Sequence, residues 1–427
     1  MSLFIFLIVC FIVTIFLAIP IYISLSLSSL LAVLFYTGTN VGAIVQRMFG
    51  GIDKFALMAV PYYILAADIM IEGSMAKRLL DWVNSLLRGF RGSHAIATQA
   101  ACTVFGSLSG SSPATVVAIG KLMYPELVKN KYGKGFTTGL LVSSGSVALL
   151  IPPSITFIIY GSVTGVSVGA LFMGGIVAGL IYSLAIIGYS YFYACRHDIV
   201  GAEKLDWGEV WRLTKEAGWS FGVPVIILGG IFAGVFTPTE AAGVSVIYAM
   251  FVSLFIYKEM DLKKLIQVCV KSSISIAQVM ILLGAAAVFS WVITESYVPQ
   301  TLIANVVNVL PSKYVFLIII NVIFLIAGMF IDGGAAVMML APLIYLPAVN
   351  MGIDPVHLGV ILVANVCIGM FSPPFGLNLF VANSITGLSI SDMVRPVLPF
   401  FIVTLIALII ITYVPGVALF LPRLAGY

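Results

Sequence analysis

Two segments of this chain place adjacent prolines and polar residues inside runs that are otherwise apolar. Residues 151–167 read IPPSITFIIYGSVTGVS, and residues 372–389 read SPPFGLNLFVANSITGLS. Proline lacks the N–H that a helix needs, so each pair predicts a helix break, at Pro152 and Pro153 and at Pro373 and Pro374. Carbonyl oxygens freed before a break can bind a hard cation. The N-terminus of the half-helix that follows favours an anion such as a carboxylate.

A second irregularity precedes each proline pair. Residues 106–114 read GSLSGSSPA, and residues 328–336, about 222 positions later, read GMFIDGGAA. Pro125 and Pro347 have the same spacing, and both half-helices end at Thr-Gly-x-Ser. The chain is therefore predicted to contain two tandem copies, about 21–195 and 240–422. Each copy has a Gly/Ser-rich hairpin followed by a discontinuous helix.

Prolines and glycines also have a simpler explanation. A proline can merely kink a transmembrane helix, and a glycine can merely allow two helices to pack closely. Two proline pairs in register, each preceded at the same distance by a Gly/Ser break, instead favour a binding site. Irregular backbone at membrane depth is tolerated where it lines a cavity, and duplicated broken helices are typical of secondary transporters.

The composition indicates that membrane-spanning helices position these breaks. Hydrophobic residues make up 61% of the 427 residues and charged residues 9%, which excludes a soluble globular protein. We predict an all-α polytopic membrane protein, a single unit over 1–427, with roughly ten to twelve helices of about 20 residues. The first 46 residues contain no Asp, Glu, Lys, Arg or His and are expected to be a membrane anchor. The span Leu3–Tyr36 is either one long tilted helix or two helices separated at Pro20.

Basic residues and amphipathic stretches predict the topology. Lys and Arg concentrate in 196–215 and 258–271, so these loops are expected in the cytoplasm and the turn 236–240 outside. Segments 74–90 and 296–310 are too polar to span. We interpret them as interfacial amphipathic helices, with ordinary connecting loops as the alternative.

Four stretches resemble the large membrane subunit of the tripartite ATP-independent periplasmic (TRAP) transporters: VPYYILAADIMIEG (60–73), GSLSGSSPATVVAIG (106–120), GLLVSSGSVALLIPPSITFIIYG (139–161) and GGIFAGVFTPTEAAGVSVIYA (229–249). The resemblance implies inverted repeats and an elevator-type fold. The moving transport domain would comprise 95–165 and 315–390, and the scaffold 1–92, 170–312 and 395–427.

The resemblance also implies an activity and partners. It implies sodium-coupled import of an organic acid across the bacterial inner membrane, with about two or more coupling sodium ions and no organic cofactor. The implied partners are a separate four-helix small membrane subunit and a soluble periplasmic substrate-binding protein. No nucleic acid is implied, and which organic acid is carried stays open.

Roles for individual residues follow from the resemblance and from the chemistry of the breaks. The first sodium cage is expected from Ser107, Ser109, Gly110, Ser144, Gly145, Ser146 and Ala148. The second is expected from Gly328, Asp332, Gly333, Asn365, Gly369, Met370 and Ser372. Substrate is expected beside Ser112, Pro113, Thr115, Thr156, Ala336 and Asn378.

Several polar residues allow more than one role. Asp332 is a cation ligand, a substrate gate or a hairpin cap, and Asn378 binds substrate or joins two helices. Asp68 and Glu72 form either a proton relay or, as we expect, ion pairs with Lys77 and Arg78. Glu240 is expected to cap the helix that starts near Thr239.

Three other functions fit the sequence less well. The segment Gly106–Gly110 faintly resembles the nucleophile motif of an intramembrane serine protease, but its spacing is wrong and no histidine is placed to act as the base, so no catalytic residue is predicted. A passive channel fits two separate cation cages less well than alternating access does. A stand-alone sodium-coupled dicarboxylate carrier is the nearest alternative, and it differs in needing no binding protein.

Overall fold

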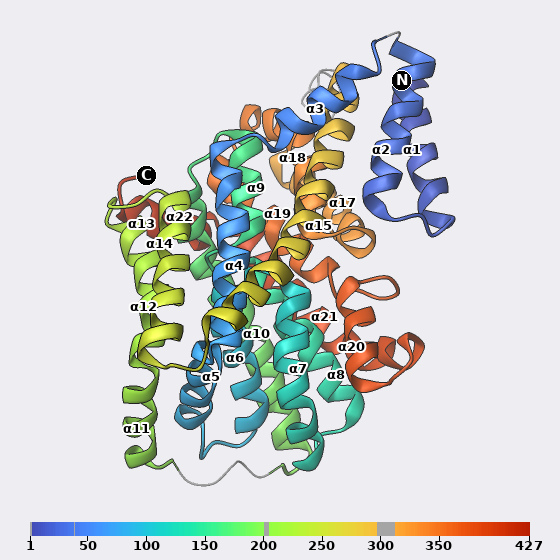
Figure 1. The fold of residues 1–427 in the computed structure, drawn as a ribbon. Coiled ribbons are helices and arrows are strands. Elements are labelled where there is room, and N and C mark those ends of the chain that lie inside the picture. The colour runs from blue at the N-terminus through green and yellow to red at the C-terminus, as the bar shows by residue number, and fades with distance from the viewer. Residues whose placement is uncertain (1, 38, 200–204, 297–311) are drawn as a thin grey trace.

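The computed structural model describes residues 2–37, 39–199, 205–296 and 312–427, and within these ranges the regular structure is entirely helical (Figure 1). The N-terminal half contains α1 (Ser2–Phe16), α2 (Ile21–Ala32), α3 (Gly42–Ile52), α4 (Ala59–Glu72), α5 (Met75–Leu86), α6 (Ser93–Ser109), α7 (Ser112–Lys129), α8 (Lys134–Ser146), α9 (Ile155–Thr164) and α10 (Val168–Arg196). The rest contains α11 (Trp207–Ala217), α12 (Gly222–Pro224), α13 (Gly230–Phe232), α14 (Pro238–Phe251), α15 (Leu262–Glu295), α17 (Lys313–Phe330), α18 (Gly333–Asn350), α19 (Pro355–Gly369), α20 (Leu377–Thr386), α21 (Ile390–Tyr413) and α22 (Pro415–Leu424). Short 3-10 or π segments, η1 to η6, occupy Val33–Thr37, Phe55–Met58, Val147–Leu149, Gly218–Phe221, Val225–Gly229 and Val252–Ile256.

Seven helices in the described ranges are long and apolar enough to cross a membrane. Shorter apolar helices, including α9, α19 and α20, account for further parts of the predicted spans, whereas α6, α7 and α8 of the spans Ala95–Ile119 and Gly139–Ser162 belong to neither group. The first predicted span is two helices, because Pro20 separates α1 from α2, and these two pack against each other. The predicted span Trp219–Phe236 is a succession of short helical pieces rather than one regular helix.

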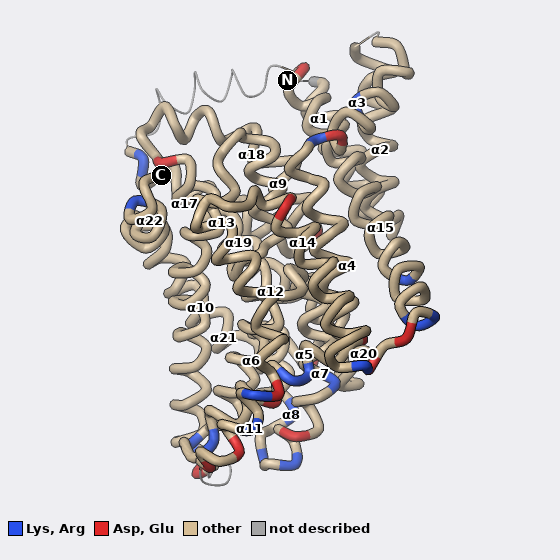
Figure 2. The backbone as a smooth tube through the Cα atoms, turned by 60° about the vertical axis from the view of Figure 1, so that its left-hand side comes forward, with Lys and Arg blue, Asp and Glu red and all other residues tan. Residues whose placement is uncertain are grey.

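Charged residues gather at one end of the molecule. Figure 2 shows Lys, Arg, Asp and Glu clustered around α5, α8 and α11 and at the start of α15, whereas the middle of the bundle is almost free of them. This pattern is typical of a membrane protein whose basic end faces the cytoplasm. On this basis, the end where α3, α9 and α18 lie in Figure 1 is expected to face outward.

Two series of helices follow the same order. Helices α6 to α10 recur about 222 residues later as α17 to α21, and α9 and α20 are both 10 residues long. The α6–α7 pair lies toward the charged end, and the α17–α18 pair lies toward the opposite end in both views (Figures 1 and 2). Both Pro-Pro segments interrupt their helices where the sequence predicted, and the peptide bond within each pair is cis.

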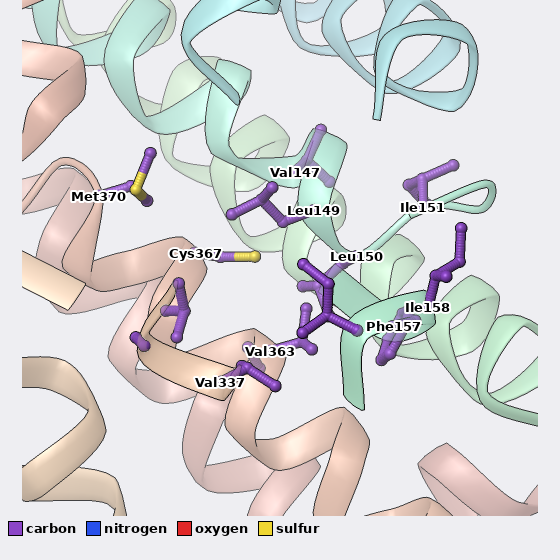
Figure 3. Packing of buried hydrophobic residues seen from close by; sticks show 14 of the residues in the cluster. Val147, Leu149, Leu150, Ile151, Phe157, Ile158, Val337, Val363, Cys367 and Met370 are labelled. Atoms are coloured by element: carbon purple, nitrogen blue, oxygen red, sulfur yellow. The ribbon is translucent and has the colours of Figure 1, made fainter. Parts of the chain in front are cut away.

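The two series pack across one shared core. Helix α9 contacts α18, while α20 contacts α7 and α8, so each half-helix after a break touches the hairpin of the other series. Figure 3 shows Leu149 and Leu150 of the first break close to Val363 and Cys367 of α19. All four side chains are buried. The central polar residues are therefore enclosed by apolar packing contributed by both series.

Only one of the two predicted interfacial segments lies within the described residues for most of its length. Helix α5 lies within 74–90 and buries one apolar face, including Leu79, Leu80 and Val83, against α6 and α11. Its position in the membrane plane stays a prediction. Except for Ser296, the segment 296–310 lies outside the described residues.

The expected partners of Asp68 and Glu72 were wrong. Ser272 Oγ donates to Asp68 Oδ2 at 2.6 Å, and the Glu72 carboxylate lies 3.8 Å from Lys264 Nζ and 3.5 Å from Lys271 Nζ. Arg78 instead pairs with Glu259. The predicted cap at Glu240 was confirmed, because Thr237 and Glu240 form a reciprocal capping box at the start of α14.

Candidate cation and substrate site

The first hairpin turns tightly beside the first helix break. Helix α6 ends at Ser109, its C-cap Gly110 has a φ of +58° in the left-handed region, and α7 begins at Ser112. A Cβ on Gly110 would lie 2.9 Å from the carbonyl oxygen of Pro153, so the hairpin tip directly abuts the Pro-Pro segment. Inside the tip, the hydroxyls of Ser109 and Thr115 are hydrogen-bonded at 2.9 Å. The turn thus requires glycine both for its conformation and for this close approach.

The hairpin backbone also lies against the end of α8. A Cβ on Gly106 would lie 2.7 Å from Ala148 Cα, and a Cβ on Gly145 would lie 2.3 Å from Val116 Cγ2. Two backbones this close bring the carbonyls at the end of one helix next to the turn of another. The hairpin and the end of α8, which carry the predicted members of the first cage, therefore pack against each other.

The second copy has a corresponding crossing. A Cβ on Gly328 would lie 3.1 Å from Gly369 Cα, and a Cβ on Gly369 would lie 2.6 Å from Gly328 Cα. At the hairpin turn, Asp332 is the N-cap of α18, and its Oδ2 accepts a hydrogen bond from Gly334 N at 2.9 Å. The structure thus contains the hairpin-cap contact foreseen for Asp332, while a role as ligand or gate stays a prediction.

Hydroxyl groups in the first predicted cage differ in their bonding. Ser107 Oγ donates to Val104 O at 2.6 Å, and Ser146 Oγ lies 2.7 Å from both Ser143 O and Tyr182 OH. A hydroxyl that donates its hydrogen keeps lone pairs that can coordinate a cation. Ser144 is fully buried, and its Oγ has no hydrogen-bond partner among the described residues. A buried oxygen without a partner is costly and requires an explanation, such as a bound ion.

The second predicted cage contains another oxygen of this kind. Asn365 Nδ2 donates to Asn321 Oδ1 and to Ile361 O, both at 2.8 Å. Asn365 Oδ1 is buried and has no partner in the described part of the chain. Ser372 Oγ donates to Ile368 O at 2.6 Å. Each predicted cage therefore includes one buried side-chain oxygen without a partner, although other buried oxygens in the described residues, such as Gln99 Oε1 and Thr137 Oγ1, also lack one.

The chemistry of these donors favours a monovalent ion. No group of three or more His, Cys, Asp or Glu side chains in the described ranges could hold a metal ion. The oxygens near the breaks are neutral carbonyls, hydroxyls and amides, except for the carboxylate of Asp332. Neutral oxygen donors suit a hard cation, and their low total charge suits one positive charge better than two.

The predicted substrate residues lie between the two copies but are closed off. Asn378 Nδ2 donates to Ser112 Oγ at 2.8 Å and to Val142 O at 2.9 Å, so Asn378 joins α20 to α7 and α8. These bonds match the helix-joining alternative for Asn378. Thr115, Thr156 and Ala336 are also buried, whereas Pro113 is half-buried. No contact tests whether these six residues bind substrate.

Sequence reasoning missed three polar residues that join helices near the predicted cages. Gln99 of α6 bonds Ser183 of α10 at 3.1 Å, and Asn321 of α17 bonds Thr412 of α21 at 3.1 Å. Gln99 and Asn321 are about 222 residues apart, and each links the first arm of a hairpin to the long helix of its own series. The third residue is Tyr182, whose hydroxyl lies 2.7 Å from Ser146 Oγ. A lone carboxamide within an apolar run was the signal that could have identified the first two.

A family model for the DctM component of tripartite ATP-independent periplasmic transporters matches residues 8–417. The chain belongs to this family. The predicted resemblance is thereby confirmed. A C4-dicarboxylate TRAP transporter large permease protein from Pseudomonas aeruginosa is 38% identical over 94% of each chain. An ectoine/5-hydroxyectoine TRAP transporter large permease protein from Ruegeria pomeroyi is 40% identical over 89% of each.

Two further comparisons concern chain length and fold. The isethionate TRAP transporter permease protein DctMQ of Oleidesulfovibrio alaskensis is 36% identical over 94% of this chain but 64% of its own greater length. The YdaH transporter of Alcanivorax borkumensis has a similar fold, with a TM-score of 0.62 over 90% of both chains and 14% identity. The TRAP relatives are transporter permeases, so the chain is not an enzyme.

Proposed function

We propose that this TRAP large subunit imports an organic acid across the bacterial inner membrane. The acid is delivered by a periplasmic substrate-binding protein, and inward sodium flow drives uptake. The observation that carries the sodium part is the pair of orphaned buried oxygens, Ser144 Oγ and Asn365 Oδ1, one beside each helix break. A sodium ion at each site would satisfy them.

The proposed cages draw on backbone as well as side chains. At each glycine crossing, the end of a broken helix offers carbonyl oxygens next to a hairpin turn. Such a cage is complete only when the hairpin and the broken helix are both in place. Sodium binding would therefore stabilise the packed arrangement of each copy and couple ion occupancy to the shape of the substrate site.

An organic acid suits the space between the copies because half-helices begin there. Ser112 at the start of α7 contacts Asn378 at the start of α20. Gly333 at the start of α18 lies near Thr156 at the start of α9, since a Cβ on Gly333 would be 3.8 Å from Thr156 Oγ1. The N-termini of α7 and α20 thus meet, as do those of α18 and α9, and helix N-termini favour a carboxylate. Relatives named for C4-dicarboxylates and ectoine leave the particular acid open.

For the transport movement, we propose two inverted repeats and an elevator mechanism. Helices α6–α9 and α17–α20 would move as one transport domain, because each half-helix packs on the other copy's hairpin. The remaining helices would form the scaffold. A small membrane subunit is proposed as a separate partner, supported by the greater length of the DctMQ relative.

The experiment is uptake into proteoliposomes that contain this chain and its small membrane partner. Radiolabelled organic acids are tested with and without a sodium gradient, and with and without the cognate binding protein. We expect uptake only when both sodium and the binding protein are present. Sodium-driven uptake that ignores the binding protein would instead establish the stand-alone carrier, and uptake that needs no sodium would reject the cation cages.

A further inference from the structure

A cavity of about 740 Å³ lies between the scaffold and the proposed transport domain, at the end of the molecule expected to face outward. Its scaffold wall comes from α3, the loop after it and the C-terminal end of α15. Its opposite wall comes from Val163 of α9 and from Met338 and Pro342 of α18. This volume is typical of small-molecule sites. The cavity lies along the boundary that must change when the transport domain moves.

Two cationic side chains line this cavity from the scaffold side. Arg47 is exposed, and its guanidinium carbon lies 5.3 Å from the centre of the Trp291 ring. Lys54 is half-buried. Among the described residues, neither has a carboxylate oxygen within 4.0 Å. The nearest carboxylate in the lining is Glu295, which accepts a hydrogen bond from Trp291 Nε1 at 3.2 Å.

Basic residues at the outer end need a reason, because Lys and Arg are retained mostly on the cytoplasmic side. Here Trp291 contacts both Arg47 and Glu295, while no carboxylate oxygen in the described residues pairs with Arg47 itself. Its planar fork can bind a carboxylate through two hydrogen bonds, and Lys54 supplies a second positive charge. The charged lining has two cations and one anion, which favours an anionic ligand.

Lys54 also connects the two walls. Its Nζ donates to the carbonyl oxygen of Ser162 at 2.8 Å, close to the C-terminal end of α9. The negative end of that helix thus holds the ammonium group in the absence of another anion. A carboxylate entering the cavity would compete for the same ammonium group and would loosen the only hydrogen bond that Lys54 makes to α9 among the described contacts.

We propose that this cavity is an outer vestibule that binds the carboxylate of an incoming organic acid through Arg47 and Lys54 before the acid reaches the central site. The inference rests on the proposed organic-acid transport. It adds a receiving site on the scaffold, separate from the six central residues. It also links arrival of the anion to release of α9, because the carboxylate replaces Ser162 as the partner of Lys54.

The test measures protection of a cysteine in the vestibule of the full chain with its small subunit. Gln46, which is exposed and lines the cavity, is changed to cysteine after the native cysteines have been replaced by alanine. A membrane-impermeant maleimide is added from outside, with succinate or with its uncharged analogue succinamide. We expect succinate to slow labelling severalfold and succinamide to have no effect. Leu424→Cys, which lies on α22 outside the cavity and is 75% exposed, is the control and should not be protected.

Substitutions of the two cations complete the experiment. Arg47→Gln should abolish protection, Lys54→Gln should weaken it, and Arg47→Lys should retain part of it. Thermal unfolding of each variant shows whether it is folded. Absence of protection by succinate in the unsubstituted vestibule, equal protection by succinamide, or full protection in Arg47→Gln would overturn the proposal.

The vestibule and the transport proposal can fail separately. Uptake that does not need a binding protein would refute the tripartite mechanism, but protection of Gln46→Cys by succinate would still support the vestibule. Uptake that depends on sodium and the binding protein, without protection at Gln46→Cys, would remove only the vestibule.

Discussion

At the first break Gly106 lies against Ala148, and at the second Gly328 lies against Gly369. The two crossings use the same backbone arrangement, but their polar groups differ. The first is lined by serines and the Ser109–Thr115 pair, whereas the second uses the carboxamides of Asn321 and Asn365 and the carboxylate of Asp332. Backbone proximity is therefore what the two crossings share, whereas the polar side chains around them differ.

The largest loss of folding stability is expected from substitutions at the two glycine crossings. A side chain on Gly369 would meet two backbone atoms of Gly328 at 2.6 and 2.7 Å, so Gly369→Val should destabilise the protein by about 3 kcal/mol or more. Gly106→Val should have a similar cost. Gly243→Ala in α14 is the control, because nothing lies within 4 Å of its added Cβ. Thermal unfolding in detergent measures all three, and an unchanged midpoint for Gly369→Val would refute the close crossing.

A finer test separates the two crossings. Part of the clash of Gly106→Ala is with Ala148 Cβ, at 2.9 Å, so adding Ala148→Gly should recover part of the lost stability. No such rescue exists for Gly369→Ala, because its neighbour is already glycine. If Ala148→Gly gave no recovery of stability to Gly106→Ala, the close approach of Gly106 to Ala148 Cβ would be refuted.

The next largest effect is expected on sodium dependence. Ser144→Ala removes a hydroxyl that has no partner in the described structure, so the sodium-free protein should be as stable as before or about 1–3 kcal/mol more stable. Its stabilisation by sodium should fall. Ser143→Ala is the matched control, because Ser143 Oγ only bonds carbonyls of its own helix. Thermal unfolding over a series of sodium concentrations distinguishes them. Identical sodium responses would show that Ser144 is not a ligand.

Substitutions of Asp332 test whether transport depends on the negative charge of its carboxylate. Asp332→Asn keeps an oxygen that can cap α18, so stability should change little. Asp332→Ala loses the cap and should cost about 0.5–2 kcal/mol. If the carboxylate is also a cation ligand or gate, Asp332→Asn should lose uptake while remaining folded. Normal uptake by Asp332→Asn would restrict the residue to capping.

The smallest effect is expected at the link between the copies. Ser112 and Asn378 are 266 residues apart in the chain and hydrogen-bonded in the structure. A double-mutant cycle with Ser112→Ala and Asn378→Leu should give a coupling energy of about 0.6 kcal/mol, a common value for hydrogen bonds between membrane helices. Chemical unfolding measures the cycle. Zero coupling would show that the contact contributes nothing to joining the copies.

The sequence was most informative where backbone chemistry is local. Both helix breaks follow from Pro-Pro pairs, and the capping box follows from Thr237 and Glu240, three residues apart. The recurrence of helix bounds about 222 residues apart was visible as repeated motifs, although it does not by itself show how the copies are oriented. Local signals of this kind survive folding because they depend only on neighbouring residues.

Contacts between distant residues could not be obtained in this way. Glu72 pairs with Lys264 and Lys271 rather than with Lys77, which is nearer in the sequence, because helix packing decides which charged side chains lie close together. The bond between Lys54 and Ser162 was likewise invisible, since it joins segments 108 residues apart. In the cages, the sequence indicated oxygen donors, but only the packed structure distinguishes the partnered Ser107 from the unpartnered Ser144.

Sodium binding at the two helix breaks is tested most directly by equilibrium binding of radioactive sodium to the purified chain. We expect one ion at each helix break, and therefore two ions per chain. Ser144→Ala and Asn365→Ala should each lose one ion and keep the other. No bound sodium in the native chain, or an undiminished number of bound ions in both variants, would contradict the two-cage account.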